Sequence, residues 1–157
     1  AAKADIVLQS FRAGVAKRQG VDADTLRKIN PNLVYLNSPG YGVNGPCGDR
    51  PAYAPTIGAG AGIARRNAAG AAQERADLTL AEKKKSAVIL YNAGTAEYAQ
   101  ADGISALSAG TAMLLGLLIR DLTGDAHELM TSMLNSAGHM LCDDVIEYSN
   151  VFSRKYF

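Results

Sequence analysis

The sequence predicts an α/β fold in which helices cover a parallel sheet, with a second half richer in helix than the first. Two short apolar runs, at residues 4–9 and 33–36, have the length and composition of buried strands. The segment between them has a helical pattern and short links on both sides. A strand, a helix and a second strand in this order form a βαβ unit, which makes the two strands parallel.

The helix of this unit has recognisable ends. Asp22 is a good N-cap residue, and the Asn-Pro pair at residues 30–31 ends the helix because proline disfavours the helical conformation in the residue before it. Leu26 and Ile29 then lie on one face of the helix. Residues 14–19, before it, have room for one or two further helical turns.

A loop with four glycines and three prolines occupies residues 38–51, directly after the second strand. Such a composition excludes a regular helix or strand. The loop leaves the carboxyl end of a strand, which is where open α/β sheets usually bind their ligands. We therefore expect part of a binding site here.

The second half is expected to be mainly helical. Its longest predicted helix, residues 104–122, is apolar nearly all round, which indicates burial in a larger body, and Gly124 follows as a C-cap. The remaining expectations are a small-residue segment at 56–67 that packs tightly, an amphipathic helix at 73–87, a helical continuation or a strand at 88–91, a strand at 128–133 and a helix at 134–148.

Composition bounds the classes of protein. A chain of 157 residues with 48% apolar and 20% charged residues suits one globular domain. The net charge of +1 gives no electrostatic reason to expect nucleic acid or a membrane surface as a partner. The longest apolar stretch, residues 114–119, is shorter than a bilayer span, so no membrane segment is expected.

The residues that most often build metal and triad sites are sparse. Cys47 and Cys142 belong to no Cys/His spacing, so no metal site is expected, and a reducing cytoplasm fits this usage at least as well as secretion does. Neither His127 nor His139 stands near a plausible serine or cysteine partner. Asp102 stands at the start of the long apolar helix, where unpaired amides favour an anion. Taken alone, it is interpreted as an ordinary helix-start aspartate.

Four sequence blocks, in this order, resemble family III (CaiB/BaiF-type) CoA-transferases. Residues 11–14, with Arg18 nearby, are similar to the family's Asn-Phe-Arg-Pro-Gly segment, and residues 22–35 to its helix followed by an Asn-Pro pair and a strand. Residues 40–53 resemble its glycine-rich loop with Gly-Pro and Arg-Pro pairs. Residues 120–124 resemble the end of the helix whose head carries the family's catalytic aspartate, and the family spacing places that residue at Asp102.

The resemblance implies a Rossmann-like part of a large domain, with Asp102 as nucleophile. The aspartate would attack an acyl-CoA thioester to give an anhydride, take up CoA as an aspartyl thioester, and pass it to a carboxylic acid. CoA and acyl-CoA are then substrates, and no permanently bound cofactor is expected. The residues that the resemblance assigns to CoA binding are Ser10, Phe11, Arg12, Arg18, Tyr41 and Gly42. For either arginine a surface ion pair is the competing interpretation.

Several positions depart from the family pattern and keep alternatives open. Ser10 replaces asparagine, Ala13 proline, Cys47 tyrosine and Ala54 aspartate. These losses motivate an alternative, a non-catalytic CoA-binding or scaffold segment of a duplicated protein. An α-methylacyl-CoA racemase is disfavoured because Tyr53 stands at the position of its histidine, and a phenol with a pKa near 10 is a poor base at neutral pH.

The resemblance also implies an incomplete unit. Family members continue on both sides of the matched blocks, so residues 1–157 are expected to form a single partial domain from the middle of a longer chain. We expect that chain to form a cytoplasmic homodimer, and the isolated segment to be inactive. Nothing in the residues marks the acyl donor or the acceptor acid.

Overall fold

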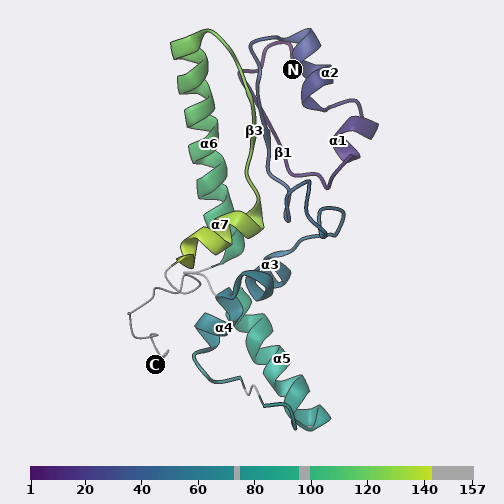
Figure 1. The fold of residues 1–157 in the computed structure, drawn as a ribbon, viewed down its shortest axis with the longest axis vertical. Helices are drawn as coiled ribbons and strands as arrows, with labels where there is room; N and C mark the ends of the chain where they lie inside the picture. Colours follow the sequence, from purple (N-terminus) through teal and green to yellow (C-terminus); the bar gives the residue numbers. More distant parts are fainter. Residues whose placement is uncertain (73–74, 96–99, 143–157) are drawn as a thin grey trace.

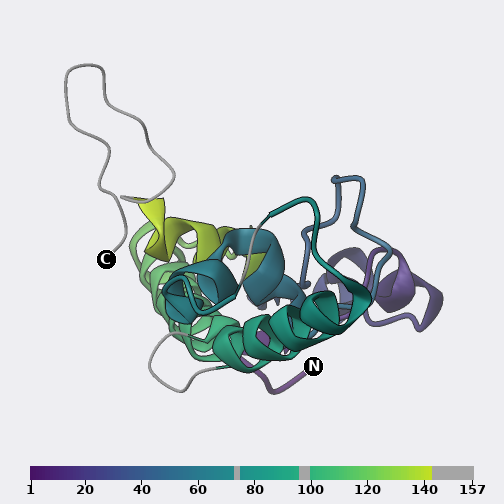
Figure 2. The same ribbon diagram turned by 90° about the horizontal axis from the view of Figure 1, so that it is seen from below.

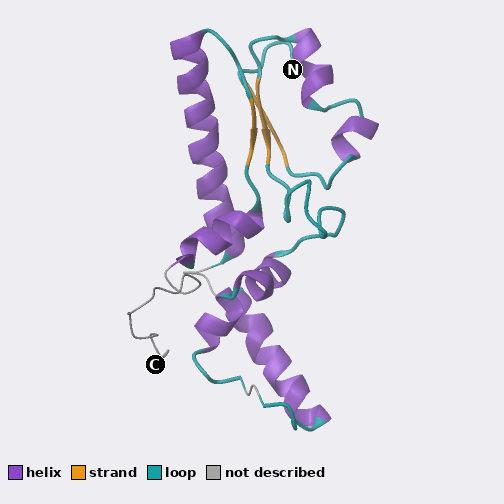
Figure 3. Ribbon diagram, in the orientation of Figure 1, coloured by secondary structure: helices purple, strands orange, loops and turns teal. Residues whose placement is uncertain are grey.

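The computed structural model describes residues 1–72, 75–95 and 100–142, and Figure 1 shows their arrangement. A small sheet lies between helices in one part of the molecule, and a group of helices extends beyond one end of the strands (Figure 3). The elements in chain order are β1 (Ile6–Gln9), α1 (Val15–Arg18), α2 (Ala23–Ile29), β2 (Val34–Asn37), α3 (Ala54–Ala61), α4 (Ile63–Ala68), α5 (Leu80–Gly94), α6 (Ala101–Thr123), β3 (Glu128–Met130) and α7 (Met133–Met140).

The sheet has three parallel strands in the order β1-β2-β3. This order confirms the predicted βαβ unit and the α/β class. All four residues of the central strand β2 are buried. Strand β1 was expected to be buried but is only partly so, and Leu8 is 48% exposed, because β1 lies at the edge of the sheet as the structure describes it. Strand β3 ends at Met130, three residues earlier than predicted.

Helix α2 covers one face of the sheet. Tyr35 and Leu33 are buried there with Ala23, and Leu26 packs against them. The Tyr35 hydroxyl donates to the carbonyl of Val21 at 2.6 Å. Burial raises the pKa of the Tyr35 hydroxyl, and the carboxylates of Asp22 and Glu128 raise it further.

The predicted ends of α2 are confirmed. Asp22 accepts from the amide of Thr25 at 3.2 Å, and the helix stops at Ile29, before the Asn-Pro pair. The Thr25 hydroxyl lowers the pKa of the Asp22 carboxyl by donating to it. The shared apolar face is only half correct, because Leu26 packs inward whereas Ile29 is 60% exposed.

Helix α6 covers the opposite face of the sheet and approaches it closely at one glycine. A Cβ on Gly116 would stand 2.6 Å from Leu129 Cδ1 and 2.7 Å from Val34 Cγ1, so no larger residue fits without a shift. The predicted cap is confirmed, since Gly124 ends the helix in the left-handed conformation at φ 80°. The helix is longer than predicted and begins at Ala101.

The other flank of α6 carries exposed leucines. These are Leu107, Leu114, Leu115, Leu118 and Leu122. The expected burial of the whole helix is therefore not seen among the described residues, where only Ala101, Ala109 and Gly116 are buried. By length and composition α6 could cross a membrane. No membrane segment was expected from the sequence, because its longest uninterrupted apolar stretch covers only residues 114–119. One such helix is weak evidence for a span, because the core helix of a soluble protein meets the same criteria.

Helices α3, α4 and α5 form the group beyond the carboxyl ends of the strands, and α3 packs on α6 and α7 (Figure 1). Seen from below, α3 and α4 lie beside α7 and the foot of α6 (Figure 2). The small-residue segment forms α3 and α4, which meet at Gly62, and α3 approaches α5 where Gly58 faces Gly94. Residues 88–91 continue α5 and are not a strand.

Capping side chains fix the starts of α5 and α7. Thr79 and Glu82 form a reciprocal capping box on α5, and hydrogen bonds from Thr79 lower the pKa of the Glu82 carboxyl. Ser132 accepts from the amide of Asn135 at the start of α7. Helix α7 begins one residue earlier than predicted and ends at Met140; residues 143–157 lie outside the described part of the chain.

The close contact at Gly116 predicts a destabilising substitution. Gly116→Ala should lower the thermal unfolding midpoint of the full-length protein, because overpacking costs about 1–3 kcal/mol. This exceeds the gain in helix propensity of about 1 kcal/mol. Gly110→Ala on the same helix is the matched control, since no described atom beyond the helix's own neighbouring backbone lies within 4 Å of its added Cβ. It should leave the midpoint unchanged or raise it. An equal rise for both variants would contradict the close contact.

Candidate active site at the carboxyl edge of the sheet

Two loops leave the carboxyl ends of neighbouring strands and are tied to each other. Residues 10–14 follow β1, and residues 38–53 follow β2. The Ala13 amide donates to the carbonyl of Gly48 at 3.4 Å, and Arg12 Nη1 donates to the carbonyl of Asp49 at 3.1 Å. The predicted binding loop is therefore confirmed as irregular backbone, and it is held against the loop that contains Arg12.

Close backbone approaches shape the longer loop. Gly42 has φ 83°, a conformation that favours glycine. A Cβ on Gly48 would stand 3.1 Å from the carbonyl oxygens of both Gly42 and Val43. Gly40 leaves no room for a side chain beside Ala52, and its carbonyl accepts from the Leu134 amide at 2.9 Å. The loop is thus folded tightly upon itself and bonded to the start of α7.

Asp102 is the second residue of α6, at the end of the helix that lies nearest the two loops (Figure 1). Its spacing from Ala109 and Gly116 places it on the flank of α6 that packs on the sheet, away from the exposed leucines. The residue is exposed. Among the described residues, its carboxylate has no hydrogen-bond or ion-pair partner, and no side chain caps the amides of the first turn. An acidic group here is available to a ligand.

Tyr41 links the glycine-rich loop to the start of α6. Ala101, which precedes Asp102, is fully buried with Ile57, Ile63, Ala137 and Leu141. Tyr41 and Ala52 pack against this same cluster. Tyr41 and the residue before Asp102 therefore belong to one apolar cluster.

The remaining predicted CoA contacts lie on the shorter loop and the first helix. Ser10, Phe11, Arg12 and Arg18 are all exposed. The Arg18 guanidinium folds back over Gly14, with Nη1 3.2 Å from the position of a Cβ there. Within the described residues, no ion pair engages Arg12 or Arg18, so the competing interpretation of surface ion pairs has no support. No hydrogen bond there joins them to Asp102.

A row of polar side chains across the three strands was missed by sequence reasoning. Gln9 donates to Asn37, and Asn37 Nδ2 donates to Glu128 Oε1 at 2.5 Å. Gln9 Oε1 in turn accepts from the Phe11 amide at 2.6 Å. The available signal was a polar residue at the end of each of two apolar strands.

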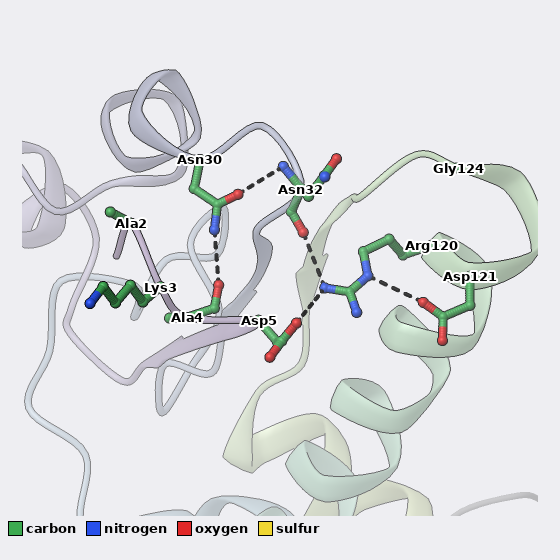
Figure 4. Close-up of a pocket in the computed structure, with 9 residues that line it drawn as sticks. All are labelled: Ala2, Lys3, Ala4, Asp5, Asn30, Asn32, Arg120, Asp121 and Gly124. Atoms are coloured by element: carbon green, nitrogen blue, oxygen red, sulfur yellow. Dashed lines mark hydrogen bonds and ion pairs between the residues drawn. The ribbon is translucent and has the colours of Figure 1, made fainter.

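A shallow pocket of about 550 Å³ opens at the other edge of the sheet, where the strands begin. Figure 4 shows Arg120 at its centre, bonded to Asp5 at 3.1 Å, to the Asn32 carbonyl at 3.3 Å and to Asp121 at 3.4 Å. The guanidinium is thus already engaged in joining the end of α6 to the starts of β1 and β2. This pocket lies at the opposite end of α6 from Asp102.

Two further sequence interpretations can be placed. The described residues contain no group of three or more His, Cys, Asp or Glu side chains that could hold a metal ion. Tyr53 is 64% exposed at the start of α3, and its amide donates to the Thr56 hydroxyl at 3.0 Å.

Comparison with known proteins gives consistent matches. The model of CoA-transferase family III matches residues 1–155. A segment of 60 residues is 45% identical to the probable fatty acyl-CoA transferase Rv3272 of Mycobacterium tuberculosis, and covers 38% of this chain and 15% of that protein. Another of 61 residues is 44% identical to the acetyl-CoA:oxalate CoA-transferase of Acetobacter aceti, covering 39% and 16%.

Solved structures give the same picture over more of the chain. The crystal structure of Rv3272 matches with a TM-score of 0.67 and 28% identity, covering 89% of this chain and 34% of that one. A CaiB/BaiF family protein from Brucella suis matches in fold with a TM-score of 0.67 at 23% identity, covering 91% and 33%. The chain therefore spans about a third of the length of these solved relatives.

The fold of the two loops predicts the effect of a single methyl group. Gly48→Ala should speed amide deuterium exchange in residues 11–14, because the added Cβ forces the carbonyls of residues 42 and 43 away and weakens the bond from Ala13. Gly45→Ala is the control, since its Cβ would stand 3.8 Å from the nearest described atom, an ordinary contact. Mass spectrometry of deuterated peptides measures both. Unchanged exchange in the Gly48 variant would show that the loops are not coupled.

Proposed function

Since the chain belongs to CoA-transferase family III, we propose that it supplies the nucleophile and part of the CoA site of an enzyme that transfers CoA from an acyl-CoA thioester to a carboxylic acid. The observation that carries the proposal is the setting of Asp102. Its carboxylate is exposed and unpartnered among the described residues, on the first turn of a 23-residue helix, at the end of that helix that lies nearest the two loops at the carboxyl edge of a parallel sheet (Figure 1).

The proposed reaction begins with attack by the Asp102 carboxylate on the thioester carbonyl. The C–S bond breaks, and CoA leaves as a thiolate while a mixed anhydride forms on the aspartate. The thiolate then attacks the aspartyl carbonyl and displaces the donor acid as a carboxylate, which leaves an aspartyl-CoA thioester. The acceptor carboxylate enters by the same two steps in reverse, so the acceptor leaves as a CoA thioester and the Asp102 carboxylate is restored.

Elements near Asp102 suit these steps. Each attack places negative charge on a carbonyl oxygen, and backbone amides stabilise such an oxyanion without reorganising. The first turn of α6 presents amides that no described side chain caps, and the glycine-rich loop brings backbone to the same edge. Arg12 and Arg18 are free of ion pairs among the described residues, and their guanidinium groups suit the phosphates of CoA.

The expected setting of the activity belongs to the same proposal. We infer a homodimer that acts in the cytoplasm, and an isolated segment that lacks activity because the chain spans only about a third of its solved relatives. The acetyl-CoA:oxalate and succinyl-CoA–malate transferases among the relatives support acyl-CoA thioesters and carboxylic acids as the substrate classes.

Removal of the nucleophile gives the direct test. In the full-length protein, Asp102→Ala should lower kcat for CoA transfer by at least about 10³-fold, because the covalent route is lost. Asp102→Asn, which keeps the shape, should be comparably impaired. Turnover is measured by liquid chromatography of the acyl-CoA product, and hydroxylamine should trap an acyl group on the wild-type protein but on neither Asp102 variant.

Asp121→Asn provides the control on the same helix, since Asp121 lies at the far end of α6 from Asp102. It should leave kcat and trapping unchanged. Undiminished transfer by the Asp102→Ala variant would refute the nucleophile. Binding of CoA without any trapped acyl group in the wild-type protein would favour the scaffold alternative.

The two arginines are expected to act in binding and not in bond making. Arg12→Ala and Arg18→Ala should each raise KM for acyl-CoA about tenfold while kcat changes little, as for loss of one charge-assisted bond. Arg75→Ala is the control, because Arg75 lies before α5 and forms an ion pair at 2.8 Å with Glu82 on that helix. A fall in kcat at constant KM would contradict the binding role.

A further inference from the structure

We propose that Asn37 and Glu128 are positioning residues for the loop after β1: together they orient the Gln9 amide, which fixes the backbone at Phe11. The effect of this positioning on catalysis rests on the proposed function, because residues 10–12 are candidate CoA contacts. The proposal begins from the four groups that form one continuous hydrogen-bonded row, Glu128, Asn37, Gln9 and the Phe11 amide.

The sheet register places these side chains within reach of one another. Gln9 pairs with Asn37 across β1 and β2, so their side chains leave the sheet on the same face. Glu128 pairs with Tyr35, two residues before Asn37, and is therefore a diagonal neighbour on that same face. The parallel register of all three strands is thus a condition for the row.

The carboxylate at one end of the row gives it a direction. An ionised Glu128 can only accept, so Asn37 must turn its amide nitrogen toward Glu128 and its oxygen toward Gln9. Asn37 Oδ1 then requires the Gln9 nitrogen, which leaves Gln9 Oε1 facing the loop. A carbonyl oxygen can only accept a hydrogen bond, and the Phe11 amide donates one to Gln9 Oε1 at 2.6 Å.

Burial makes the orientation of Asn37 strict. Asn37 is only 8% exposed, so water cannot readily replace a lost partner. If the amide turned over, its nitrogen would face the Gln9 nitrogen, and a carbonyl oxygen would face the Glu128 carboxylate. Both contacts would be repulsive. The exposed end of the row at Glu128 therefore controls a buried amide, and through it the start of the loop.

The loop held in this way contains the candidate CoA contacts. Phe11 is followed by Arg12, which reaches the Asp49 carbonyl and so ties the loop to residues 38–53. A loosened Phe11 amide lets Arg12 sample more positions. This should weaken binding of CoA while leaving the chemistry at Asp102 in place.

Three variants of the full-length protein test the row. Glu128→Leu removes the acceptor at an exposed position; Glu128→Gln keeps an acceptor oxygen and serves as the conservative rescue; Asn37→Asp removes the donor to Glu128. Glu128→Leu and Asn37→Asp should speed deuterium exchange in residues 10–13 and raise KM for acyl-CoA about tenfold with kcat nearly unchanged. Glu128→Gln should show much smaller effects.

Met130→Leu is the matched control, since Met130 is an exposed neighbour on the same strand and the same face, and this change adds no polar group beside Asn37, with which it pairs. The proposal would be overturned if deuterium exchange in residues 10–13 of the Glu128→Leu variant is as slow as in the wild-type protein. The Glu128→Leu variant alone decides this if Asn37→Asp fails to fold. Exchange does not depend on CoA transfer. If exchange responds while Asp102→Ala retains full activity, the proposed function fails and the positioning role stands.

Discussion

The contact between α6 and the sheet at Gly116 is the constraint on which the rest of the structure depends. Because glycine has no side chain, the helix axis comes close to Val34 and Leu129, and the helix is fixed over the face of β2 and β3. Ala101 is buried at one end of the helix, and Arg120 bonds to Asp5 and Asn32 at the other. These three attachments set the position of Asp102 relative to the carboxyl ends of the strands.

The local pattern of the sequence was sufficient for the elements but not for their long-range contacts. Asp22, the Asn-Pro pair at residues 30–31 and Gly124 act within one turn of chain, so the ends of α2 and α6 could be predicted from neighbouring residues. Residues 88–91 are β-branched in part yet continue α5, because the preceding capping box had already committed the chain to a helix. The exposure of Leu8 depends on which strands neighbour β1, and no local pattern records that.

The same distinction between local patterns and long-range contacts applies to the candidate site. The family blocks pointed to Asp102, Arg12 and Tyr41 one position at a time, and the structure places them at one edge of the sheet, although their roles remain predictions. The bond from Asn37 to Glu128 joins residues 91 positions apart, and it exists only because parallel register makes them diagonal neighbours. A single sequence could suggest a polar residue at each strand end, but not the row that these residues form.

Magnitudes indicate how such a site would work. A helix start stabilises an adjacent anion by about 0.3–1 kcal/mol, which is small beside the roughly 8 kcal/mol or more that enzymes remove from a barrier. Holding two reactants in the right geometry contributes about 7–11 kcal/mol. The position of Asp102 therefore matters more than the field around it. On this basis the proposed chemistry depends chiefly on the supports of the site: the Gly116 contact that fixes the helix, the buried Ala101 next to Asp102, and the row from Glu128 that we propose holds the loop.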